Sequence, residues 1–166
     1  TLRPSAIGKQ DLEQRRQEAK ETFAKQREAF QQKLQTIRDE KKKALVARLT
    51  TNLNNINKKR TDKMLEQLNR ISKVLEKVKG KNVSAVEAAV GSAQSAIDAA
   101  KSAVAAQAGK EYVATITSED NLRTDMGTIM KSLQSDLQAV HRLVVAAHKS
   151  VQEAVQALAS VLGEKR

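Results

Sequence analysis

Clusters of basic side chains are the first candidates for chemistry in this sequence. Two runs on the chain supply them: Lys41, Lys42, Lys43, and Lys58, Lys59, Arg60. Cations at this density bind nucleic acid or another polyanion by releasing its condensed counterions. The alternative is a solvated helix face, which the interspersed Asp39, Glu40 and Asp62 favour. No aromatic side chain stands near either run to stack on bases, and no known nucleic-acid-binding signature is present.

Residues suited to catalysis or metal binding are scarce. The two histidines, His141 and His148, are seven positions apart, about 10.5 Å along a helix, which is too far to share one metal ion. There is no Cys, which excludes disulfides, cysteine metal sites and thiol catalysis. No carboxylate pair, nucleophile motif, phosphate-binding loop or dinucleotide fingerprint occurs. We therefore expect a protein that is not an enzyme, with no catalytic, cofactor-binding or metal residues.

The composition predicts an all-α fold. The chain has 166 residues with one Pro and six Gly, too few turn-forming residues for an all-β protein. Its net charge is +11, and the basic excess lies before Gly80, whereas the later part is rich in Ala and Val. No apolar run approaches the ~18 residues that a transmembrane span needs. The length suits a single helical domain over 9–166, preceded by an extended segment over 1–8.

Apolar spacing predicts a first helix over residues 9–79. Its clearest seam alternates steps of four and three: Met64, Leu68, Ile71, Leu75 and Val78. A second set connects this seam to the start of the helix: Leu45, Leu49, Leu53 and Ile56. Residues 50–55 are Thr- and Asn-rich and poor in helix formers, so a kink is expected there if anywhere. Gly80 is the expected stop.

Two further helices are predicted over 84–108 and 118–162. Ser84 followed by Glu87 has the pattern of a capping box at the start of the second helix. That helix is Ala-rich, and small side chains allow close approach of helix axes. The third helix carries an apolar seam that begins at Leu122 and continues through Val140 and Val151.

Helix lengths predict the packing. The second and third helices are about 38 Å and 67 Å long. The connection 109–117 can span at most ~30 Å, so an extended connection would make up the difference. We therefore expect Tyr112 or Ile116 to be buried, in an elongated antiparallel three-helix bundle or coiled coil with one very long basic first helix. That helix would extend beyond its partners and leave an apolar seam without cover: Leu12, Phe23, Phe30 and Leu34.

Three stretches carry a resemblance: IRDEKKK at 37–43, NKKRTD at 57–62 and TSEDNLR at 117–123. With the leucine-seamed helix and the Ala/Val-rich last helix, they resemble uncharacterised secreted helical proteins of small-genome bacteria. The resemblance implies an extracellular or cell-envelope location and no known activity. The basic composition is also similar to that of a periplasmic holdase chaperone with coiled-coil arms, although its β-strand trimerisation core is lacking. The chain begins at Thr1 rather than Met, so we expect a processed or trimmed product.

These observations favour a structural function. We expect an exported subunit that assembles with copies of itself through coiled-coil contacts, as in a filament or an envelope layer. Leu12, Phe23, Phe30 and Leu34 are the candidate self-association residues, because an apolar seam on a charged helix calls for a partner. The alternative is a basic polyanion-binding or holdase-like protein that uses the two basic runs.

Overall fold

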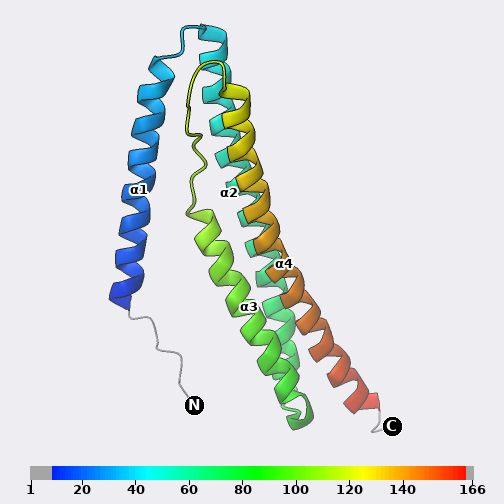
Figure 1. Cartoon of the computed structure of the whole chain (residues 1–166). Helices are drawn as coiled ribbons and strands as arrows, with labels where there is room; N and C mark the ends of the chain where they lie inside the picture. The colour runs from blue at the N-terminus through cyan, green and yellow to red at the C-terminus, as the bar shows by residue number, and fades with distance from the viewer. Residues whose placement is uncertain (1–8, 164–166) are drawn as a thin grey trace. The chain divides into compact units, whose positions relative to one another are not determined.

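Four α-helices make up most of the described chain (Figure 1). The computed structural model describes residues 9–163, and side chains from residue 13 onward. The helices follow one another as α1 Lys9–Gln35, α2 Glu40–Lys79, α3 Glu87–Ala108 and α4 Leu122–Gly163, with a 3₁₀ turn, η1 Ser84–Val86, before α3. No strand occurs within residues 9–163, so the predicted all-α class is confirmed. The extended segment predicted over 1–8 lies outside the described residues.

The chain divides into two compact units, which are described separately. The first unit comprises Thr1–Thr51 and Glu111–Ile129, and the second comprises Asn52–Lys110 and Met130–Arg166. Helices α2 and α4 each contribute residues to both units.

The predicted unbroken helix over 9–79 is wrong, because the chain breaks between Gln35 and Glu40. The reason is a cap at Asp39. Its carboxylate accepts hydrogen bonds from the backbone N–H groups of Lys41 and Lys42, at 2.9 and 3.2 Å. An Asp at this position satisfies backbone donors that a new helix leaves without partners. Residues 50–55, where a kink was expected, are helical throughout.

The connection between α3 and α4 belongs to the first unit from Glu111 onward and confirms the prediction for this segment. Figure 1 shows it as an open thread without helical turns. Tyr112, Ala114 and Ile116 are only 3–4% exposed, whereas Thr115 and Thr117 are exposed. Burial of every second side chain is the pattern of extended backbone with one face against a core.

The same unit buries the end of α1. Phe30 and Leu34 are each 6% exposed, and Ile37 in the break is 3% exposed. Two polar contacts join the connection to this region: Arg27 forms an ion pair with Glu111, and the Glu119 carboxylate accepts the backbone N–H of Arg38 at 2.9 Å. The expectation that nothing in the same chain covers Phe30 and Leu34 is therefore wrong.

The second unit has a core shared by α2, α3 and α4. In Figure 1, α3 runs antiparallel to the other two helices, which run in the same direction. The core residues are Met64, Leu68, Ile71, Leu75, Ala93, Ile97, Ala100, Val104, Val140, Val144, Ala147, Val151 and Ala154. The four alanines have no exposed surface, so small side chains mark the helix contacts as expected.

The buried face of α2 includes polar positions that apolar spacing did not identify. Leu45 and Ile56, which were expected in the seam, are each 45% exposed. Asn57 and Thr61 take the buried positions instead, at 2% and 1% exposure, in step with Leu53 and the seam that follows. Helix α2 is therefore rotated about its own axis, relative to the orientation that its apolar residues alone predicted.

A network of hydrogen bonds explains the buried polar residues. The Asn57 side-chain amide donates to the backbone carbonyls of Gln107, at 2.9 Å, and Lys110, at 3.2 Å. The Gln107 side chain, itself 1% exposed, donates back to Asn57 Oδ1 at 2.9 Å. The last carbonyls of a helix lack partners within that helix. Asn57 therefore supplies donors where α3 ends and the open connection begins.

Helix ends follow the sequence signals only in part. Gly80 follows the last residue of α2, as predicted. The capping box predicted at Ser84 does not form. The second predicted helix begins with the 3₁₀ turn η1, α3 starts at Glu87, and neither helix start has a side-chain cap. The third predicted helix starts at Leu122 rather than near Ser118. Before it, the backbone N–H of Thr117 donates to the Asp125 carboxylate at 2.8 Å, which holds the connection against the first turns of α4.

The Glu119 carboxyl should titrate below the ordinary glutamate range. The backbone N–H of Arg38 and the ammonium of Lys42, 3.6 Å away, lower its pKa by stabilising the charged form. We expect an NMR titration to place it below glutamate in a short peptide. In Lys42→Gln the pKa should rise but remain depressed, because the backbone bond contributes most.

The lowered pKa of Glu119 determines how the stability of the folded protein changes with pH. A depressed pKa gives stabilisation that is fully present above the carboxyl's unfolded-state value and is lost as the pH falls through the folded-state value. Glu119→Gln should therefore flatten the acid dependence of unfolding. A Glu119 pKa equal to that of the peptide would contradict this account.

Replacing Asn57 by Ala should destabilise the second unit. The change removes the hydrogen bonds of the Asn57 amide to the Gln107 and Lys110 carbonyls and to the buried Gln107 side chain, which costs about 1–3 kcal/mol. Urea unfolding followed by circular dichroism measures the effect, and Asn55→Ala, at an exposed position of the same helix, is the matched control. Equal midpoints for the two variants would show that the buried amide network contributes nothing.

Candidate polyanion-binding face

The two predicted basic runs do not form patches of free cations. Lys42 pairs with Glu119 at 3.6 Å, and Lys43 pairs with Glu40 at 3.9 Å. Lys58 pairs with Asp62 at 2.8 Å. Of the six candidate residues, Lys41, Lys59 and Arg60 have no ion-pair partner within the part of the chain that the structure describes. Runs of adjacent residues also point in different directions around a helix, so each run spreads its charge.

A different arrangement of cations lies along α2 in the second unit. Five exposed side chains, which we call the cationic stripe, share one face of this helix: Lys59, Lys63, Arg70, Lys73 and Lys77. Their steps of four, seven, three and four residues keep them within about 80° of the helix circumference. The stripe lies on the side opposite the buried seam and is about 27 Å long.

Few acids neutralise the stripe. Glu66 is the one carboxylate in the same line, and it contacts Arg70 at 3.5 Å. Lys59, Lys63, Lys73 and Lys77 have no ion-pair partner among residues 13–163. Over residues 58–81 there are nine Lys or Arg and three Asp or Glu, a net of +6. The potential of such a row is felt over roughly a Debye length, about 8–10 Å at physiological salt.

The outward faces of the neighbouring helices differ from that of α2. On α3 the exposed positions are chiefly small and neutral, such as Ser92, Ser95 and Ala99. On α4 the exposed cations Lys131, Arg142 and Lys149 also share one face, but they stand eleven and seven residues apart. The cations of α2 are therefore the more closely spaced row in the described part of the second unit.

The candidate self-association residues are only partly available. Phe30 and Leu34 are buried within the first unit, as described above. Phe23 is half-buried, whereas every other described residue of α1 from 13 to 29 is exposed. The side chain of Leu12 lies outside the described residues. Of the three candidate side chains that the structure describes, Phe23 alone therefore remains within reach of another molecule.

No metal site is assembled in the described region. His141 and His148 both lie on the exposed side of α4, two turns apart. Within residues that the structure describes, no group of three His, Cys, Asp or Glu side chains is placed to hold a metal ion. None of the described helices combines the length and the apolar character that crossing a membrane requires.

Comparison with known proteins leaves the chain without an assigned relative. No protein-family model, no curated protein and no solved structure matches it. Function must therefore be argued from the charge and geometry of this chain alone.

Proposed function

We propose that this protein is a non-enzymatic binding protein that holds flexible phosphate polymers along the cationic stripe of α2. The observation that carries the proposal is the alignment of Lys59, Lys63, Arg70, Lys73 and Lys77 on one exposed line, with one carboxylate in it. A straight row of cations about 27 Å long fits a linear chain of phosphates laid along it.

Counterion release supplies the driving force. Each phosphate neutralised by Lys or Arg frees a condensed cation, so affinity falls linearly with the logarithm of the salt concentration. Five contacts on a single strand predict a slope of about −3.5. No aromatic side chain lies on the stripe, so binding should not depend on base sequence.

Salt-dependent binding of a fluorescent oligothymidylate tests the proposal. In Lys63→Gln, Lys73→Gln the slope should become shallower by about 1.4, because two contacts are lost. The matched control is Lys131→Gln, Lys149→Gln on α4, which removes the same charge from the same unit. Polyphosphate should compete with the oligonucleotide. If both variants lose affinity equally, only net charge matters and the stripe is not a site.

A second function, self-association, is favoured by the exposure of α1. We infer that Phe23 contacts another copy of the chain and that α2, α3 and α4 pack in coiled-coil fashion, as their seam spacing suggests. This contact would allow the protein to act as an exported, envelope-associated subunit of filaments or layers. The proposed location outside the cell or in its envelope rests on the sequence resemblance.

Sedimentation of Phe23→Ser against the parent protein tests self-association. Burying one Phe is worth about 1.5–3 kcal/mol, so the parent should associate with rising concentration and the variant should remain a monomer with unchanged helix content. Gln26→Ser, at an exposed position one turn away, is the control. A parent protein that stays monomeric at high concentration would reject the subunit function.

A further inference from the structure

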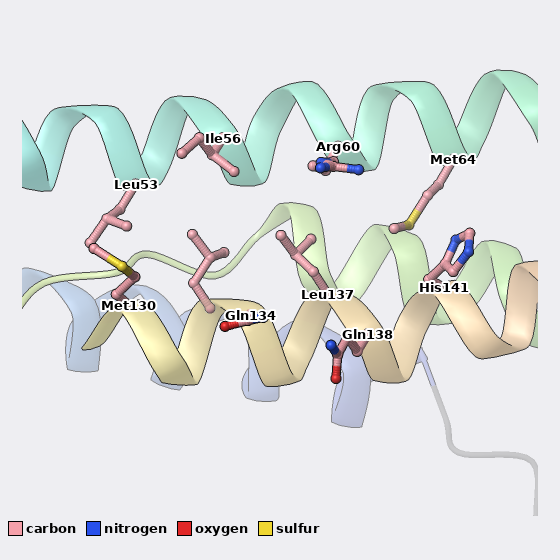
Figure 2. A pocket seen from close by; sticks show the side chains of 10 residues that line it. Leu53, Ile56, Arg60, Met64, Met130, Gln134, Leu137, Gln138 and His141 are labelled. Carbon is pink, nitrogen blue, oxygen red and sulfur yellow. The ribbon is translucent and has the colours of Figure 1, made fainter. Parts of the chain in front are cut away.

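An apolar groove runs between α2 and α4 in the second unit (Figure 2). It encloses about 460 Å³, within the ~300–1,000 Å³ range of small-molecule sites. Its lining residues are Leu53, Ile56, Arg60, Met64, Met130, Leu133, Gln134, Leu137, Gln138 and His141. From Leu53 to Met64 it extends about 16 Å along α2.

The floor of the groove is buried and its rim is exposed. Leu53, Met64 and Leu133 are only 3–6% exposed. Ile56 and Met130 are 45% and 49% exposed, although both are large and apolar. Figure 2 shows Leu53 near Met130 at one end, and Met64 near His141 at the other. Methionine side chains adapt their shape to a ligand at low cost. An alkyl chain along this groove would cover apolar surface that water now contacts.

The polar groups of the groove favour an anion. Arg60, which is always charged, lies on α2 between Ile56 and Met64 and lines the groove (Figure 2). It has no ion-pair partner among the residues that the structure describes. No carboxylate lines the groove, and Gln134, Gln138 and His141 add further hydrogen-bonding groups.

We infer that this groove binds a single-chain amphipathic anion, an alkyl tail with a carboxylate or phosphate head. The tail lies over Leu53, Met64 and Leu133, and the head pairs with the guanidinium of Arg60. A second copy of α1 fits less well, because Phe23 shares its helix face with the cations Arg16 and Lys20. These would meet Arg60 as like charges. The inference is independent of the cationic stripe, which lies on a different face of α2.

Calorimetry with dodecanoate and dodecyl phosphate, each below its micelle concentration, tests the inference. Both should bind with one molecule per chain, and dodecanol should bind at least tenfold more weakly, because it lacks the charge. Arg60→Gln should weaken both anions about tenfold or more, through loss of a charged hydrogen bond. Met130→Gln should weaken all three ligands, since it makes the rim polar.

The control is Lys149→Gln, which removes an exposed charge of α4 outside both the groove and the stripe and should leave ligand affinity nearly unchanged. Equal losses in Arg60→Gln and Lys149→Gln would overturn the inference, because surface charge alone would then explain binding. Dodecanol binding as tightly as the anions would overturn it, as would absence of binding by both anions. Concentration-dependent dimers that Met130→Gln abolishes would assign the groove to a second copy instead.

Discussion

The buried amide pair of Asn57 and Gln107 is the contact on which the second unit depends. Asn57 donates to the carbonyl of Gln107 in the last turn of α3, which the backbone N–H of Lys110 also reaches, and to the carbonyl of Lys110 just beyond the helix. For that purpose Asn57 must face α3, which fixes the rotation of α2 about its own axis. Once this rotation is set, Thr61 and the leucine seam follow it into the core. Lys63 and Lys73 then face solvent on the far side.

The same rotation separates two surfaces of one helix. The cationic stripe lies opposite the core, whereas Arg60 lies toward the groove beside α4. Under the two proposals, a long polymer of phosphates and a short amphipathic anion would therefore meet different cations of α2. The exposed face of α3 carries no such row of cations and is mostly Ala and Ser, so a helix of this unit does not need a cationic outer face to pack against its neighbours.

Regular features of this fold were predictable from the sequence. The all-α class, the end of α2 before Gly80 and the alternating burial of Tyr112 and Ile116 follow from composition, stop signals and periodicity. The break at Asp39 was missed because the apolar spacing continues across it. Asp39 is a residue type typical of a helix cap, but the N–H groups that donate to it are in place only because of a turn that apolar spacing does not reveal. The burial of Asn57 was not predicted, because it depends on the hydrogen bond with Gln107, a residue fifty positions away in the sequence. The cationic stripe could not be predicted from the sequence, because its residues are three to seven positions apart and only the buried face of α2 shows which of them point to solvent. The basic runs at 41–43 and 58–60 were predicted instead because their residues are adjacent.

If the stripe is the binding site, the position of the cations on α2, and not the number of cations on the protein, determines affinity. The most direct measurement compares the parent with a variant of equal net charge in which two cations are moved off the line: Lys63→Gln, Lys73→Gln, Ser92→Lys, Ser95→Lys. Ser92 and Ser95 are exposed on α3, so the new lysines cost the fold little. Titration with the same single-stranded oligonucleotide at several salt concentrations should show weaker binding and a shallower salt slope for the rearranged variant. Parent affinity and an unchanged slope would contradict the account, because net charge would then suffice.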